Sequence, residues 1–206
     1  MARGAEPRPE VVVLLGGPGA GKGTQAQLLS AALGVPHISS GVLLRGQSSP
    51  GTQSVMSRGD LLPDDVATDV VLARLQQPDA ARGAVLDGFP RTLEQARRLD
   101  RWLEQRGGGA RAAIYLDVPT GELTHRLAGR AVVSGRSDDR AGTTATRLDA
   151  FQKELPSVLE YYAGRGLLRQ VNGARPVEEV HRSIMQALAP RPRDDNPRTC
   201  SQDRAS

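Results

Sequence analysis

The chain of 206 residues is long enough for one domain with a full hydrophobic core and small insertions. Its net charge of +4 comes without a basic run, and only 2 Phe, 3 Tyr and 1 Trp are available for base stacking, so we expect no nucleic-acid partner. No apolar run is long enough to cross a bilayer, so we also expect no membrane partner. A single cysteine, Cys200, and an N-terminus without an apolar signal segment favour a reducing, cytoplasmic location.

The first predicted elements are a strand and a helix joined by a glycine-rich loop. Residues 10–15, EVVVLL, form a short β-branched run that predicts a buried strand. The sequence KGTQAQLLSAAL follows the loop, and its apolar residues recur at helical spacing at Ala26, Leu29 and Leu33. A strand, a glycine loop and a helix in this order are the context that a phosphate-binding P-loop requires.

The loop from Gly16 to Gly23, GGPGAGKG, carries the chemistry of this motif. Its glycines allow backbone N–H groups to turn inward on a phosphate, and the following helix adds its positive end. Lys22 is one of only two lysines in a chain with 25 arginines, and a slim ammonium enters a phosphate nest where a guanidinium collides. In a strict P-loop the lysine is followed by a Ser or Thr that touches Mg²⁺, whereas here Gly23 follows and Thr24 comes one place late.

The alternation of strands and helices continues along the chain. Strands are predicted at residues 37–39, 84–87, 112–118 and 167–171, and helices at 63–76, 92–106, near 120–129, 142–165 with a kink at Pro156, and 176–188. Five strands that alternate with helices predict an α/β fold whose parallel sheet is covered on both faces. Residues 1–9 and 190–206 are rich in Pro, Arg and Asp, so we expect disordered tails around one domain at 10–189.

The stretch LDGFPR, residues 86–91, combines a carboxylate and an arginine at the end of a predicted strand. Asp87 stands where α/β proteins place ligand groups, and a carboxylate there in a P-loop fold can hold Mg²⁺ through water. Pro90 stiffens the turn that aims Arg91. The structural alternative for this stretch is an ordinary Asp-Gly turn.

The stretch HRLAGRAVVSGRSDDRAGTTATR is rich in arginine, with Arg126, Arg130, Arg136, Arg140 and Arg147 beside Asp138 and Asp139. Arg126 and Arg130 are four residues apart and share one face of a helix. Residues 131–142, AVVSGRSDDRAG, lack helical periodicity and predict a mobile flap. The alternative is a charge-balanced surface in contact with solvent.

Together these motifs resemble the adenylate kinases with a short lid, within the nucleoside monophosphate kinases. The matching pieces lie in the family's order over residues 10–189: GGPGAGKGTQ, SSGVLLR, MSRGDLLPDD, LDGFPRTLEQA, RLAGRAVVSGRSDDR and GLLRQVNGARPVEEV. The resemblance implies a P-loop NTPase fold with a monophosphate-binding insertion at about 39–62 and a lid at about 129–140. It also accounts for Gly23, because the family's loop has Gly-Thr after the lysine. Its Mg²⁺ is held by the phosphates of two nucleotides and by waters, with an acidic residue at the position of Asp87.

The resemblance implies reversible phosphoryl transfer from Mg·ATP to AMP, giving two ADP, by a monomer. Lys22 and the loop backbone would hold the ATP phosphates, through Gly19, Ala20, Gly21, Gly23 and Thr24. AMP would be held by Ser40, Arg45, Asp60, Leu61, Leu62, Gly88, Phe89, Pro90, Arg91 and Gln95. In this group Gln95 would read the adenine edge, because its amide offers one donor and one acceptor.

The resemblance also assigns roles to the arginines near the predicted lid. Arg126 would stack on the adenine of ATP, and Arg175 lies where the family touches this base through its backbone. The residues around the transferring phosphoryl group would be Lys22, Arg91, Arg130, Arg136 and Arg147, with Asp138 holding the arginines in place. Arg136 and Arg147 would bridge the two phosphate chains and so contact both substrates.

The chain departs from the family pattern in three places. Val42 replaces the usual Asp, Arg140 replaces the usual Asn, and residues 45–59 form a span several residues shorter, with a tight turn at 49–51. We therefore expect weaker binding of AMP. Two alternatives stay open, a kinase for CMP or UMP and an ATP-binding module with reduced kinase activity. Gln95 favours AMP, and the complete set of arginines favours an active enzyme.

Overall fold

The computed structural model describes residues 8–46, 54–55, 58, 60–134 and 141–189. Five strands form one sheet in the order β2-β3-β1-β4-β5, and every neighbouring pair is parallel. The strands are β1 (Glu10–Leu15), β2 (His37–Ser39), β3 (Gly83–Asp87), β4 (Gly109–Asp117) and β5 (Leu168–Asn172). This arrangement confirms the predicted α/β fold with a five-stranded parallel sheet.

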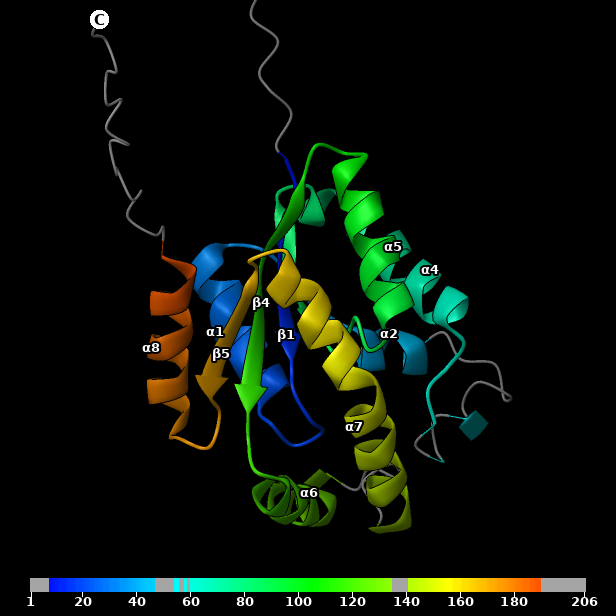
Figure 1. The fold of residues 1–206 in the computed structure, drawn as a ribbon, viewed down its shortest axis with the longest axis vertical. Helices are drawn as coiled ribbons and strands as arrows, with labels where there is room; N and C mark the ends of the chain where they lie inside the picture. The colour runs from blue at the N-terminus through cyan, green and yellow to red at the C-terminus, as the bar shows by residue number, and fades with distance from the viewer. Residues whose placement is uncertain (1–7, 47–53, 56–57, 59, 135–140, 190–206) are drawn as a thin grey trace, which may run out of the picture.

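Helices cover both faces of this sheet (Figure 1). One face packs against α1 (Lys22–Leu33) and α8 (Val177–Leu188), and the other against α4 (Asp64–Leu75), α5 (Leu93–Glu104) and α7 (Ala141–Gly164). The helix α6 (Thr120–Ser134) follows the carboxyl end of β4 and lies beyond the strand ends at the bottom of the view. Two short elements complete the described chain, α2 (Ser40–Gly46) and the 3₁₀ helix η1 (Pro78–Ala80).

The alternation of side chains along β1 explains why both faces must be covered. Val11, Val13 and Leu15 belong to the core beneath α4, α5 and α7, whereas Val12 and Leu14 belong to the core beneath α1 and α8. All five side chains are at most 4 % exposed. A strand that is buried on both faces reads as a continuous apolar run, as β1 does in the sequence.

Several predicted boundaries shift for physical reasons. β4 begins at Gly109 instead of 112, because Gly109 and Ala110 pair with Glu10 and Val11 of β1. Pairing with β1 therefore makes a strand of a segment whose sequence is typical of a glycine-rich loop. Pro9 is buried and its carbonyl accepts a hydrogen bond from the N–H of Gly109, so the folded domain includes this residue of the predicted tail.

The prediction that residues 131–142 form a non-helical flap is wrong at both ends. α6 continues through residue 134, and α7 begins at residue 141. Helix propagation adds one hydrogen bond for each residue ordered, and no Gly or Pro interrupts α6 between 131 and 134. Residues 135–140, the turn at 49–51 and the remainder of both predicted tails lie outside the described residues.

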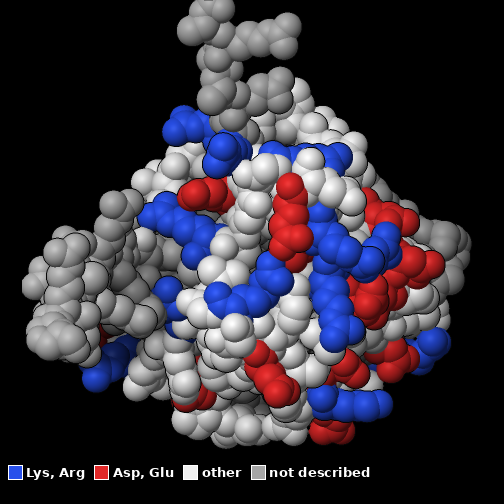
Figure 2. Space-filling view, turned by 45° about the horizontal axis from the view of Figure 1, so that its top comes forward, with Lys and Arg blue, Asp and Glu red and all other residues white. Residues whose placement is uncertain are grey.

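Acidic and basic side chains are interspersed on the face seen in Figure 2. The described surface residues also form ion pairs, including Arg74 with Asp79, Arg98 with Asp69 and Arg165 with Glu104. Exposed pairs of this kind contribute little stability. None of the helices in the described part of the chain has the length and apolar character needed to span a bilayer.

Gly83→Ala should destabilise the fold severely. Gly83 begins β3 with φ of 123°, and an added Cβ would lie 1.8 Å from the carbonyl oxygen of Glu10. Backbone strain and this collision together should cost about 3 kcal/mol or more of the free energy of unfolding. Gly107→Ala is the matched control, because Gly107 also has a positive φ, of 68°, but has open space around it. Urea unfolding should show a much smaller loss for the control, and equal losses would contradict the role of the collision.

Candidate active site

A cleft of about 870 Å³ opens at the carboxyl ends of the strands. Six separate parts of the chain line it: the glycine loop with α1, the segment from β2 through α2, Asp60, the end of β3 with the turn after it, α6, and the start of α8 with the loop before it. The predicted site residues among its walls are Gly19, Ala20, Gly21, Lys22, Gly23, Thr24, Arg45, Asp60, Asp87, Gly88, Arg91, Arg126 and Arg175. Ligand sites in open parallel sheets lie at this edge.

The glycine loop holds Lys22 in a defined position. The Nζ atom of Lys22 donates to the carbonyl oxygens of Gly16 at 2.8 Å and Gly17 at 2.9 Å, so the loop wraps around its own lysine. Gly19 and Gly21 have φ of 84° and 90°, a region that other residues adopt only with strain. The first N–H groups of α1 have no partner within the helix, which leaves them to face an anion.

Close packing against α6 is a second reason for glycine in this loop. A Cβ on Gly17 would lie 2.6 Å from Cδ1 of Leu123, and one on Gly19 would lie 3.0 Å from the Leu123 carbonyl oxygen. Leu123 itself is 4 % exposed. The loop therefore packs against α6, and this contact leaves no room for a side chain at Gly17 or Gly19.

Asp87 ends β3 directly opposite the start of α1. Its Oδ2 atom lies 3.5 Å from Nε2 of His37 and 3.5 Å from the position of a Cβ on Gly23. Burial acts to raise the pKa of Asp87, but the His37 imidazole and the charges of Lys22 and Arg91 outweigh it, so the pKa is lowered. The carboxylate is thus held ionised beside the glycine loop.

The carbonyl oxygen of Gly88 joins two parts of the predicted AMP-binding set. It accepts a hydrogen bond from Oγ of Ser40 at 2.6 Å and one from Nε of Arg91 at 2.7 Å. Ser40 is 2 % exposed and starts α2, so this contact fixes α2 against the turn after β3. Ser40 and Arg91, 51 positions apart in the sequence numbering, are therefore brought to one carbonyl group.

Other predicted AMP-binding residues lie beside the cleft instead of lining it. Leu61 and Pro90 line a neighbouring cavity of about 80 Å³. Leu62 packs with Leu44 in a small core cluster, and Phe89 is 1 % exposed in the main core. These four residues are therefore not among the walls of the main cleft.

Arg126 connects α6 to the loop between β5 and α8. Its guanidinium donates to Oε1 of Glu122 at 2.7 Å and to the carbonyl oxygens of Gly173 at 3.0 Å and Ala174 at 3.4 Å. Arg175 follows in the same loop and also lines the cleft. The two residues to which the resemblance assigns contacts with the ATP base are therefore neighbours in space.

Four predicted residues cannot be placed in the cleft. Arg136 and Asp138 lie outside the described residues, and Arg130 and Arg147 belong to α6 and α7 at positions whose side chains also lie outside the description. Gln95 is described, but it is 2 % exposed and is absent from the cleft walls.

The cleft walls include residues that are missing from the set chosen from the sequence, among them the polar side chains of His37 and Gln25. His37 approaches Asp87, and Gln25 donates from Nε2 to the Val177 carbonyl oxygen at 2.9 Å while its Oε1 atom is buried without a partner among the described residues. A histidine that begins a strand gives no indication that it approaches a carboxylate at the end of the next strand along the chain. The sequence did offer a signal for Gln25, because it is a polar residue on the buried face of α1. Buried polar groups generally have a hydrogen-bond partner, so such a residue indicates a specific contact.

Asp87→Asn should lower the free energy of unfolding at neutral pH, because the lowered pKa means that folding stabilises the ionised carboxylate. This stabilisation is present above the ordinary carboxyl pKa of about 3.9 and is lost as the pH falls through the lower pKa of the folded state. Urea unfolding of both proteins between about pH 7 and about pH 3 should show a difference that shrinks on acidification. A difference that grows as the pH falls would contradict this account of the site.

Comparison with known proteins agrees with this geometry. The family model described as adenylate kinase matches residues 14–167. The adenylate kinase of Mycobacteroides abscessus is 44 % identical over 183 residues, and that of Stenotrophomonas maltophilia is 40 % identical over 183 residues, with 86 % of this chain and 98 % of the relative covered in each case. The adenylate kinase of Thermobifida fusca is 42 % identical over 186 residues, covering 87 % of this chain and 98 % of the relative. The glycine loop, the cleft at the strand ends and these similarities together place the chain in the adenylate kinase family.

Proposed function

We propose that the chain catalyses the reversible transfer of a phosphoryl group from Mg·ATP to AMP, giving two molecules of ADP. The observation that carries this proposal is one continuous cleft with two kinds of wall. Lys22 and the glycine loop form a triphosphate-binding wall, while Arg45 and Arg91 lie on the side predicted to hold the monophosphate. Two nucleotides bound in one cleft can react directly, without a covalent enzyme intermediate.

The chemistry requires alignment and neutralisation of charge more than covalent assistance. Lys22, Arg45, Arg91, Arg126 and Arg175 line the cleft, so positive charge faces the position of the phosphates from several sides. Preorganised charges of this kind stabilise negative charge that spreads over the phosphoryl oxygens during transfer. In this proposal Arg130, Arg136 and Arg147 complete the set, and Asp138 orients them.

The described residues fit a Mg²⁺ ion that arrives with the nucleotide. Among them no group of three or more His, Cys, Asp or Glu side chains could hold a metal, but Asp87 offers one ionised carboxylate beside the glycine loop. Mg²⁺ typically keeps several waters and binds one or two carboxylates together with substrate phosphates. Asp87 would hold the ion through water, and the ion would neutralise charge on the phosphate oxygens.

Gln95 supports AMP as the acceptor. It lies four residues after Arg91, in the first turn of α5, and its buried amide can pair with the edge of a base. The shortened span at 45–59 belongs to the same part of the proposed site, and we propose that it weakens AMP binding relative to ATP binding. We also propose that the enzyme is cytoplasmic, as the single cysteine in a polar segment favours, and monomeric, as the resemblance implies.

A panel of acceptors tests the proposed function directly. ATP and Mg²⁺ are supplied with AMP, CMP, UMP or GMP in turn, and formation of the nucleoside diphosphate is followed. AMP should give the highest kcat/KM, because its adenine matches the donor and acceptor of a glutamine amide. If kcat/KM were highest with CMP or UMP, the preferred acceptor would be a pyrimidine nucleotide instead. No turnover with any acceptor, with ATP binding intact, would support an ATP-binding module instead.

Lys22→Ala should reduce kcat by about 10²-fold or more, because it removes a charge acting on the transferring group. Lys153→Ala is the matched control, since Lys153 is the only other lysine of the chain and is exposed on α7. The control should retain the turnover of the wild type. Circular dichroism of both variants should show an intact fold, and near wild-type turnover in Lys22→Ala would remove the lysine from its catalytic role.

A further inference from the structure

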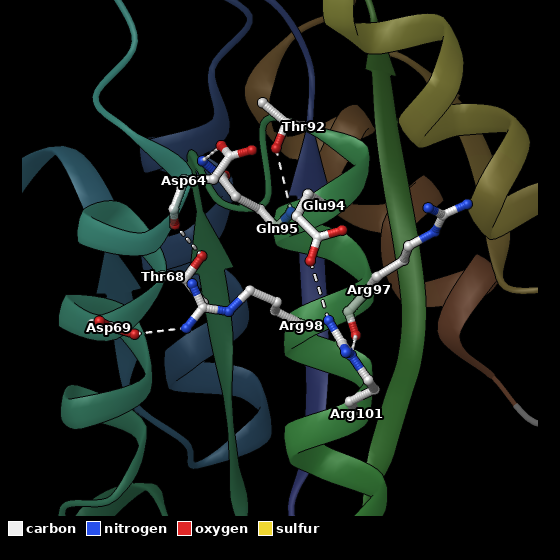
Figure 3. A network of polar contacts seen from close by, with 9 residues as sticks. All are labelled: Asp64, Thr68, Asp69, Thr92, Glu94, Gln95, Arg97, Arg98 and Arg101. Carbon is white, nitrogen blue, oxygen red and sulfur yellow. Dashed lines mark hydrogen bonds and ion pairs between the residues drawn. The ribbon is translucent and has the colours of Figure 1, made fainter.

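The amide of Gln95 is held between the start of α4 and the turn before α5 (Figure 3). Its Oε1 atom accepts a hydrogen bond from the backbone N–H of Arg91 at 2.8 Å. Its Nε2 atom donates to Oδ1 of Asp64, on the first turn of α4, at 2.8 Å. Gln95 is 2 % exposed, so both hydrogen bonds are made in a site with little access for water.

Both partners of the amide are themselves fixed. Asp64 begins α4, and the hydroxyl of Thr68, which is 0 % exposed, donates to the Asp64 carbonyl oxygen. On the other side, the side chain of Thr92 caps α5 by accepting a hydrogen bond from the Gln95 N–H at 3.3 Å. The backbone of Gln95 is therefore held by Thr92, and both hydrogen-bond partners of its side chain lie at the start of a helix or in the turn before one.

These partners allow only one orientation of the amide. The oxygen and nitrogen ends of a glutamine have nearly the same shape, so hydrogen-bond partners decide which end lies where. A backbone N–H can only donate, and a carboxylate can only accept. Turning the amide over would place its NH₂ group against the Arg91 N–H and its oxygen against the Asp64 carboxylate, so both buried hydrogen bonds would be lost.

A fixed orientation matters for the choice of base. An amide has two N–H groups and two acceptor positions, and Asp64 and Arg91 use one of each, which leaves one donor and one acceptor in fixed places. Adenine presents an amino donor at position 6 beside an acceptor at N1. Hypoxanthine presents the reverse, an oxygen acceptor at position 6 beside an N1–H donor. An amide free to turn over could match either base, whereas a fixed amide matches one.

We propose that Asp64 is a positioning residue that sets base selectivity by locking the Gln95 amide in the orientation that accepts a 6-amino purine and rejects a 6-oxo purine. This inference rests on the proposed function, in which Gln95 reads the base of the monophosphate. Asp64 acts through Gln95 and does not touch the nucleotide. Its carboxylate is essential because an acceptor-only group excludes the reversed amide.

Asp64→Asn tests this role with little change of shape. An asparagine can turn either its oxygen or its NH₂ group toward Gln95, so the contact at Asp64 no longer excludes the reversed amide. Only the Arg91 N–H still opposes it, and the reversed orientation becomes less costly. The measured quantity is the ratio of kcat/KM for AMP to kcat/KM for IMP, with saturating Mg·ATP. Because an unsatisfied buried polar group shifts an equilibrium by roughly tenfold or more, the ratio should fall by about tenfold. Both substrates are assayed with one preparation, so any loss of folded enzyme cancels in the ratio.

Two matched variants separate this role from a merely structural one. Asp69→Asn breaks the 2.8 Å ion pair between Asp69 and Arg98, which also joins α4 to α5. Asp65→Asn removes the neighbouring acidic charge from the same first turn of α4. In Figure 3 the Asp69 carboxylate is joined to Arg98, and the Asp65 carboxylate accepts a hydrogen bond from the Val66 N–H at 2.9 Å, so both variants should keep the wild-type ratio. An equal fall in the Asp69→Asn or Asp65→Asn variant would overturn the proposal.

A double-mutant cycle shows whether Asp64 acts through Gln95. In a Gln95→Ala background, Asp64→Asn should produce no further change in the ratio. A full tenfold effect in that background, or an unchanged ratio in the single variant Asp64→Asn, would overturn the proposal. Failure of the proposed function gives a different result, because the wild type itself would then show no turnover of AMP.

Discussion

Parallel pairing of β1 with β3 on one side and β4 on the other is the constraint on which the site depends. Parallel strands end at the same edge of a sheet, so the glycine loop after β1 and Asp87 at the end of β3 must meet there. Burial of β1 on both faces holds this register firmly, because slipping by one residue would exchange the two core faces. The cleft is therefore a consequence of the sheet, and the loops that line it refine its shape.

Charge within the cleft is balanced around one buried carboxylate. Asp87 lies among His37, Lys22 and Arg91, and these groups outweigh the cost of its burial, which keeps its pKa low. Lys22 is in turn held by two carbonyl groups of its own loop. Both charges are therefore fixed by the fold, so the proposed transfer would need no reorganisation of them.

Backbone carbonyl and amide groups orient the side chains on the monophosphate side of the cleft. The Gly88 carbonyl gathers Ser40 and Arg91, and the Arg91 N–H orients Gln95. A glutamine held from both ends discriminates between bases in a way that a free one does not, because selectivity depends on the cost of presenting the wrong group. In the proposed function, the turn after β3 thus connects phosphate binding to base recognition within a few residues.

The sequence alone determined the order of the elements, the parallel sheet and the phosphate-binding loop, because each depends on local signals. The β-branched run of β1, the glycines and Lys22 lie within a few residues of one another, and the alternation of strands and helices leaves few other folds. Only the tertiary structure decided which distant groups meet. The approach of His37 to Asp87, the extension of β4 to Gly109 and the pairing of Asp64 with Gln95 all join segments separated along the chain. Such contacts have no local signature, since they arise from strand register and helix packing, which depend on the whole core at once.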